Sequence, residues 1–270
     1  MNNLKTATRR FLPLLLAATL AALTALGAPA PAPAGRRAPA APTAGPVDHS
    51  AFDRLLKKHV NGQGLVSYKG FQADEKEFNQ YLALLSKNPP AAGLGKADQM
   101  AYWINAYNAF TIRLILDHYP LKSIKDIGSS IQIPFVTTPW AAKFFSIGGT
   151  KMSLDNIEHG TLRKNYNDPR IHFAVVCASL SCARLRNEAY TGARLERQLE
   201  DQGRDFLNSP AKNKVGKDAA QLSKYFDWYK GDWNENGQSV AAWVNKYSTT
   251  KMNPDAKVTF LDYNWKLNEQ

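Results

Sequence analysis

The chain has 270 residues, 44% of them hydrophobic, and carries a formal charge of +11 at pH 7. Five basic residues precede residue 47, so a charge of +6 remains on the rest of the chain. That remainder, about 220 residues, is long enough to bury a real core. Because it contains no run of arginine or lysine, its charge indicates ordinary solubility, and we expect no nucleic-acid partner.

Residues 1–27 have the pattern of an export signal. A basic start with Lys5, Arg9 and Arg10 precedes the apolar stretch Phe11–Leu26 and small residues suited to cleavage. The apolar stretch is shorter than a typical membrane span of ~20 residues. We therefore expect a periplasmic or secreted protein with no stable transmembrane segment after cleavage. Residues 28–46 read as an Ala/Pro-rich linker, and residues 47–270 as one domain.

Helices dominate the first half of that domain. Amphipathic helices are predicted over Asp48–Val60 and Ala73–Ser86, and a longer one over Asp98–His118. The long helix is apolar nearly all the way round, which predicts that it is buried. Its polar exceptions, Asn105 and Asn108, either clamp neighbouring backbone or, for Asn105, orient a catalytic histidine.

Residues 121–150 form a predicted loop region, with short strands around Ile131 and Phe144. Its length is typical of a cover over a site, although packed aromatic residues would give the same pattern. Near the C-terminus, Val258–Trp265 is predicted as a final strand. With a further helix over Ala193–Leu207, the expected fold class is α+β, a helix-rich single domain with a small β-sheet.

The segment from Ser153 to Cys182 holds the densest set of reactive groups. Ser153 is a plausible N-cap of a short helix. At about 100° per residue, Glu158 falls among the apolar positions of that helix and His159 lies on their flank. A buried carboxylate needs compensation. Glu158 is therefore either paired with Arg163 or Arg170, or perturbed for use in chemistry.

Both cysteines of the chain follow. Ile171–Cys177 is predicted as a buried strand of the sheet, so His172 and Cys177 point to opposite faces about 16 Å apart. His172 is then a hydrogen-bonded core residue, and His159 is the expected base that lowers the pKa of the Cys177 thiol. The cysteine and histidine spacings fit no zinc site, so the sequence predicts neither a metal nor a cofactor.

Several blocks along the chain carry a family resemblance. They are Trp-Ile-Asn-x-Tyr-Asn (103–108), Ser-Leu-Asp-x-Ile-Glu-His (153–159), Asp-Pro-Arg-Ile-His-Phe-Ala (168–174), Cys-x-Ser-x-Ser-Cys (177–182), Leu-Ser-Lys with Trp-Tyr (222–229) and Tyr-Asn-Trp (263–265). From about Asp48 to Asn268 the chain resembles the domain of unknown function 547 family, which includes exported bacterial proteins. Ala183 replaces the proline usual in that family, which makes the loop less rigid. The resemblance implies a domain and no catalytic residue.

Three functions remain compatible with these residues. The first is a thiol-dependent hydrolase or acyl-transferase with Cys177 as nucleophile, His159 as base, and Glu158 or Asn105 as orienting group. The second is a non-catalytic extracytoplasmic binding or scaffold domain with a Cys177–Cys182 disulfide, and the third is a thiol–disulfide role. The ligand would be a small molecule or peptide. A group of basic residues near the site allows an anionic ligand, although a solvated basic rim explains them as well (Arg163, Lys164, Arg170, Arg184, Arg186, Arg194).

Overall fold

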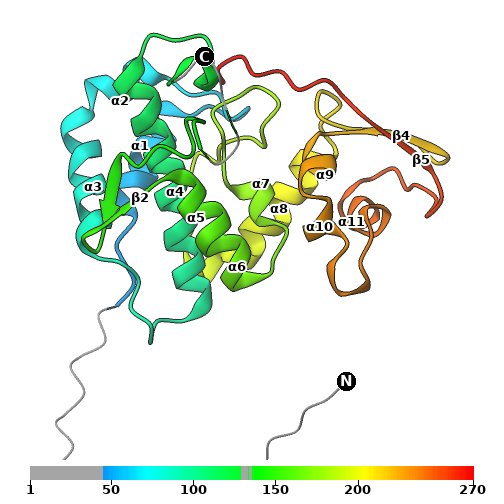
Figure 1. Cartoon of the computed structure of the whole chain (residues 1–270), viewed down its shortest axis with the longest axis horizontal. Coiled ribbons are helices and arrows are strands. Elements are labelled where there is room, and N and C mark those ends of the chain that lie inside the picture. The colour runs from blue at the N-terminus through cyan, green and yellow to red at the C-terminus, as the bar shows by residue number, and fades with distance from the viewer. Residues whose placement is uncertain (1–44, 129–132, 134–135) are drawn as a thin grey trace, which may run out of the picture. The chain divides into compact units, whose positions relative to one another are not determined.

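A computed structural model describes residues 45–128, 133 and 136–270. All of them belong to one compact unit, Pro42–Gln270. The predicted α+β class is confirmed, because helices dominate and the strands form two small sheets (Figure 1). The predicted export signal, all but the last two residues of the linker, and the strand expected around Ile131 lie outside the described residues.

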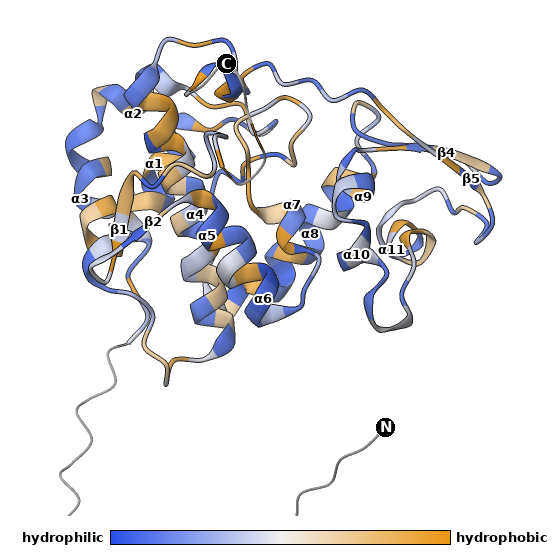
Figure 2. Ribbon diagram, in the orientation of Figure 1, coloured by the Kyte–Doolittle hydropathy of each residue, from blue (hydrophilic) through white to orange (hydrophobic). Residues whose placement is uncertain are grey.

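Helix α4, Lys96–His118, is the central element, and most of its residues are buried. Helices α1 (Ser50–His59), α2 (Tyr68–Ala73) and α3 (Glu75–Lys87) pack beside it, and Figure 1 shows them together on one side of the molecule. Figure 2 shows hydrophilic residues along much of α3, as expected for a helix with a solvent face. The burial of α4 confirms the long buried helix predicted from the sequence.

A broken helix follows the loop region. Ser153 caps α5, Leu154–Ile157, by accepting a hydrogen bond from the Asn156 amide at 3.2 Å, which confirms the predicted N-cap. The chain then widens into one π-helical turn, Glu158–Leu162, and returns to α6, Arg163–Tyr166. Such π-turns are frequent at functional sites because the extra residue re-aims neighbouring side chains.

The strand predicted over Ile171–Cys177 is wrong. Residues Ile171–Ala174 form one helical turn, α7, and the chain becomes extended only from Val175. The cause lies just upstream, where the Asp168 carboxylate accepts the Arg170 amide at 3.0 Å and Pro169 lies in the turn that leads into α7. An Asp-Pro pair is a helix-start signal, and here it overrides the β-propensity of the apolar run.

The two sheets therefore use other segments. Strands β1 (Phe145–Ile147) and β2 (Thr150–Met152) form an antiparallel hairpin. In the second sheet, β4 (Ala219–Leu222) lies between antiparallel β3 (Lys214–Val215) and parallel β5 (Lys257–Phe260). The remaining helices are α8 (Leu195–Leu207), α9 (Tyr225–Trp228), α10 (Lys230–Trp233) and α11 (Val240–Tyr247). No helix in the described ranges is both long and apolar enough to cross a membrane.

Candidate functional site: an aromatic pocket with one charged wall

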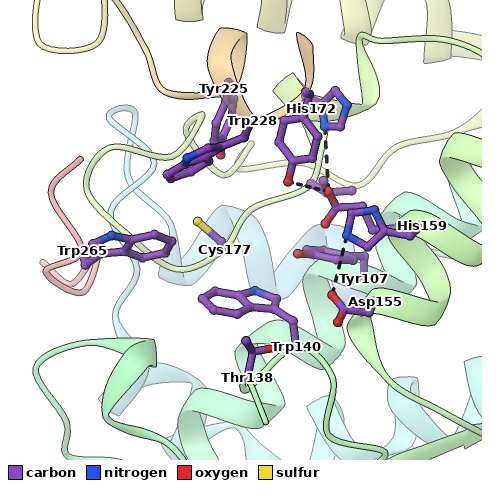
Figure 3. Close-up of a pocket in the computed structure, with 13 residues that line it drawn as sticks. Tyr107, Thr138, Trp140, Asp155, His159, His172, Cys177, Tyr225, Trp228 and Trp265 are labelled. Atoms are coloured by element: carbon purple, nitrogen blue, oxygen red, sulfur yellow. Dashed lines mark hydrogen bonds and ion pairs between the residues drawn. The ribbon is translucent and has the colours of Figure 1, made fainter. Parts of the chain in front are cut away.

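A cavity of about 230 Å³ opens where the broken helix, the segment after α7 and the C-terminal segment meet (Figure 3). Four lining residues, Asp155, Glu158, His159 and His172, come from helical segments, and we call them the helical wall. Thr138, Trp140, Val175, Cys177 and Trp265 come from extended or loop segments, and we call them the loop wall. The other lining residues are aromatic (Tyr107, Tyr225, Trp228, Tyr229).

The aromatic side chains of the pocket contact one another across long sequence separations. The Trp265 ring lies 5.7 Å from Trp140 and 5.8 Å from Trp228, measured between ring centroids. Trp265 is brought there because the loop after Cys177 hydrogen-bonds to the C-terminal segment, with the Leu180 amide donating to the Lys266 carbonyl at 2.9 Å. Trp228 remains 46% exposed, so its ring is available at the mouth of the pocket.

Glu158 is buried, as its helical phase predicts. Its Oε1 accepts a hydrogen bond from the Tyr229 hydroxyl at 2.8 Å and lies 3.9 Å from Nδ1 of His172. The expected partners lie elsewhere: Arg163 pairs with Asp232, and Arg170 pairs with Asp168, Glu196 and Glu200. The carboxylate is thus stabilised by a hydrogen bond from a phenol rather than by an ion pair with Arg163 or Arg170.

His172 is 1% exposed and its ring is fixed on both sides. It stacks on Tyr229 at 3.7 Å between centroids, and its Nε2 lies 2.8 Å from Asp232 Oδ2. Hydrogen bonds from His172 and Arg163 hold the pKa of Asp232 well below its ordinary value despite partial burial. Burial lowers the pKa of His172. A neutral His172 beside an ionised Asp232 carries its proton on Nε2 and a lone pair on Nδ1.

His159 has the same arrangement of its two nitrogens as His172, but the lone pair on its Nδ1 has a partner. Arg163 Nη1 lies 2.9 Å from Nδ1 of His159, and because a guanidinium can only donate, this Nδ1 accepts. A neutral His159 then carries its proton on Nε2, which faces Asp155 Oδ1 at 3.8 Å. Burial raises the pKa of Asp155. The Nδ1 lone pair that a base would need is therefore already engaged by Arg163.

Cys177 is half-buried and lines the same pocket as both histidines, which corrects the prediction that His172 lies on the opposite face. Its Sγ lies 3.1 Å from the Tyr263 hydroxyl and 3.4 Å from the Ser179 hydroxyl. Burial raises the pKa of this thiol, the opposite of the predicted direction. In Figure 3, Cys177 lies between the tryptophans, and His159 lies beside Asp155 at the other end of the view.

The second cysteine supports the loop that carries the first. Cys182 is buried, and its Sγ accepts the Cys177 backbone N–H at 2.8 Å and the Tyr225 hydroxyl at 3.0 Å. These donors, with the Cys177 thiol, lower the pKa of Cys182 to about 6 against the effect of burial. Both cysteines are free in this structure. Ala178, between them, adopts a left-handed φ of 56°, a strained conformation for a residue with a side chain.

The two buried asparagines of α4 act on backbone. Asn105 is not part of the pocket: its amide donates to the Tyr190 carbonyl at 2.8 Å and accepts the Tyr190 N–H at 2.9 Å. Asn108 makes the same kind of clamp on Ala174 and Val176, each at 2.9 Å. The clamping interpretation is thus the one the geometry favours, and Asn108 fixes the segment that leads into Cys177.

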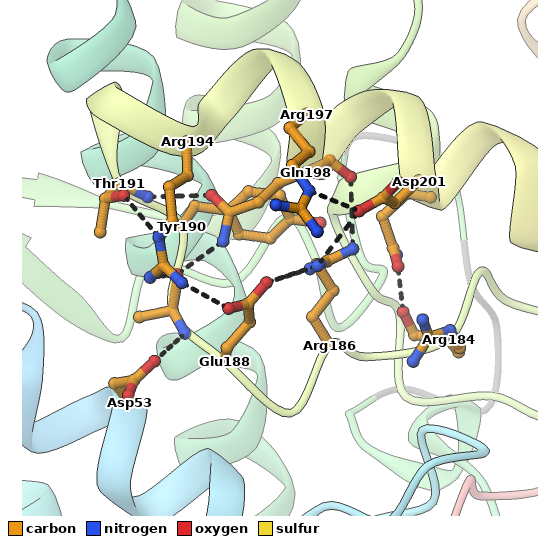
Figure 4. A network of polar contacts seen from close by, with 12 residues as sticks. Asp53, Arg184, Arg186, Glu188, Tyr190, Thr191, Arg194, Arg197, Gln198 and Asp201 are labelled. Atoms are coloured by element: carbon orange, nitrogen blue, oxygen red, sulfur yellow. Dashed lines mark hydrogen bonds and ion pairs between the residues drawn. The ribbon is translucent and has the colours of Figure 1, made fainter.

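The five arginines of the basic group near the site are engaged by carboxylates. Arg186 and Arg194 both pair with Glu188 (Figure 4). Arg184 pairs with Asp205. This network lies around the start of α8 and also includes Gln198, which holds the Ala189 carbonyl at 2.9 Å. It reads as a structural network and offers little support for an anion site. Within the described ranges, no group of three His, Cys, Asp or Glu could hold a metal ion.

Sequence reasoning missed most of the pocket. Asp232 and the aromatic side chains of α9 and the C-terminal segment were not among the predicted site residues. A signal did exist for some of them, because Trp228, Tyr229 and Trp265 belong to the motifs that carry the family resemblance. Trp140 and Asp232 carried no local signal, since Trp140 reaches the pocket, and Asp232 reaches His172, through tertiary contacts alone.

Comparison with known protein families gives a match over part of the chain. The family model described as "Protein of unknown function, DUF547" matches residues 91–207, which confirms the resemblance predicted from the motifs. The matched segment contains α4, the whole helical wall and both cysteines. Neither the curated proteins nor the solved structures gave a significant match.

Proposed function

We propose that this protein binds a small organic ligand whose head is positively charged and whose body is apolar. The observation that supports this most is the pairing of two carboxylates, Asp155 and Glu158, with six aromatic side chains around one cavity. Aromatic faces attract a cation by about 0.5–2 kcal/mol each, most strongly when water is excluded. Neither lysine nor arginine is among the described residues that line the pocket, so a cation is a better fit than an anion.

A titration with choline tests this proposal. Choline carries a quaternary ammonium, and 3,3-dimethyl-1-butanol is its neutral isostere, so the pair isolates the effect of charge. Tryptophan fluorescence should change with choline and respond far more weakly to the alcohol. Glu158→Gln should weaken choline binding about tenfold through loss of one buried charge, whereas Glu235→Gln, an exposed carboxylate away from the pocket, should not. Equal affinities for both compounds would contradict the proposal.

A thiol-dependent hydrolase or acyl-transferase is the second candidate, and the position of Cys177 in the pocket lining favours it. Because burial raises the thiol pKa, the reaction would need a bound substrate to promote thiolate formation. Exposure to p-nitrophenyl acetate followed by mass spectrometry tests it. Acetylation of Cys177 with release of p-nitrophenol supports the enzyme. Cys182→Ala controls for reaction at the buried thiol, and an unmodified Cys177 contradicts this candidate.

We further propose that the pocket works outside the cytoplasm, on the strength of the export pattern in residues 1–27. N-terminal sequencing of protein taken from its native compartment should give a mature chain that begins near Ala28. An intact Met1 on soluble cytosolic protein would overturn this proposal.

A further inference from the structure

The polar end of the pocket contains two acceptors that face a common point. His172 Nδ1 and Glu158 Oε1 are 3.9 Å apart, too far for a direct hydrogen bond. A nitrogen or oxygen donor placed about 2.9 Å from each of them completes a triangle of ordinary hydrogen-bond lengths. Both residues line the cavity, so such a donor could belong to a bound molecule.

Each acceptor has a lone pair to offer. Among the described residues, His172 Nδ1 has no hydrogen-bond partner although its side chain is almost fully buried. A buried polar atom without a partner destabilises the folded protein, and a ligand donor would remove that cost. Glu158 Oε1 receives the Tyr229 hydroxyl, but a carboxylate oxygen has two lone pairs and can accept a second donor.

The surrounding contacts hold this pair of acceptors in place. Asp232 accepts from Nε2 of His172, which keeps the lone pair on Nδ1, and Arg163 fixes Asp232 through two of its nitrogens. Tyr229 both stacks on the imidazole and donates to Glu158. Trp233, with its centroid 5.4 Å away, packs against the imidazole as well.

We infer that His172 and Glu158 together bind a primary ammonium group, so the ligand of the pocket is a primary amine in its protonated form. This inference rests on the proposed function and narrows its ligand class from cations in general to cations with N–H donors. The imidazole selects for the donor hydrogen, and the carboxylate selects for the charge. A quaternary ammonium satisfies only the second requirement.

Two cations of nearly equal size test the inference. tert-Butylammonium has three N–H donors and tetramethylammonium has none. Wild-type protein should bind tert-butylammonium at least about tenfold more tightly, as expected for one hydrogen bond to a charged donor. His172→Phe keeps a ring that can stack on Tyr229 but removes the acceptor, so it should bind both cations equally and as weakly as wild type binds tetramethylammonium.

A second measurement, nitrogen NMR, uses the wild-type protein and needs no variant. In wild-type protein with ¹⁵N-labelled histidine, tert-butylammonium should move the Nδ1 resonance of His172 away from its unbonded position, and tetramethylammonium should not. If both cations bind with equal affinity and the resonance stays in place, the pair holds an ordered water only and the inference is overturned while the proposed function stands. If neither cation binds, the proposed function fails and the inference fails with it.

Discussion

The two walls of the pocket differ in how their polar groups are supported. On the helical wall, Glu158 and His172 have fixed partners, and the ionised Asp232 sets the tautomer of the imidazole. On the loop wall, the Cys177 thiol contacts the hydroxyl groups of Ser179 and Tyr263 and the Cys182 thiol, and burial raises its pKa. An arrangement suited to proton acceptance and ligand recognition is thus found on the helical wall, although the cysteine is the more conspicuous residue in the sequence.

The largest expected effect comes from removing the charge of Asp232, which supports the helical wall through His172. Asp232→Asn leaves Arg163 and the buried His172 without their anion. Breaking a buried network of this kind costs about 3–5 kcal/mol, which urea unfolding would measure. Asp201→Asn is the matched control, because Asp201 is 38% exposed and its ion pairs contribute less than about 1 kcal/mol. A similar, small loss in both variants would show that the network does not stabilise the wall.

A histidine away from the pocket provides a reference for pH dependence. Burial lowers the pKa of His49 from 6.5 to about 4. Below pH 6.5, His49 is protonated in the unfolded chain but stays neutral in the folded protein. The free energy of unfolding should therefore fall as the pH drops from 6.5 to 4. The shift corresponds to roughly 3 kcal/mol.

His49→Asn should remove the contribution of His49 to the pH dependence of stability. The contribution of His172 in the pocket should remain, because burial lowers its pKa as well. Denaturation curves at several pH values would separate the two. An unchanged pH profile in His49→Asn would mean that His49 titrates normally in the folded protein.

The aromatic side chains should affect binding more than folding. Trp228 is 46% exposed, so Trp228→Ala should cost little stability but weaken choline binding about tenfold through the lost cation–π contact. Trp243→Phe, in a tryptophan outside this pocket, should leave choline affinity unchanged. Calorimetric titration of both variants gives the comparison, and equal losses would place the choline site elsewhere.

The smallest effect is expected at the loop wall. Because burial raises the pKa of the Cys177 thiol, iodoacetamide should alkylate it more slowly at pH 7.5 than it alkylates a free cysteine. His159→Ala should leave that rate unchanged, since Arg163 already engages the lone pair of His159. Rapid alkylation of Cys177 that slows in His159→Ala would instead support the predicted pair of Cys177 as nucleophile and His159 as base.

Local signals predicted a useful part of this arrangement. The cap at Ser153, the burial of Glu158 and the buried central helix all follow from patterns within one turn or one helix. The predicted strand over Ile171–Cys177 is wrong because the Asp168-Pro169 turn starts a helix there and overrides the β-propensity of the apolar residues. That one error reversed the roles expected of the two histidines, since it placed His172 behind the sheet.

Other features were beyond local reasoning. Asp232 reaches His172 across 60 residues, and Tyr229 reaches Glu158 across 71. Such pairs depend on how α9 and α10 pack against the broken helix, and no periodicity in either segment reports that packing. The tautomer of His172 likewise depends on a tertiary partner, Asp232, whereas that of His159 depends on Arg163, four residues along the same broken helix.

The central claim is that the helical wall offers a neutral imidazole with an available lone pair. Nitrogen NMR of histidine-labelled protein at pH 7 tests it most directly, with His172→Phe used to assign the signal. We predict that His172 carries its proton on Nε2 and that Nδ1 resonates as an unprotonated nitrogen. A proton found on Nδ1, or a doubly protonated ring at this pH, would contradict the account.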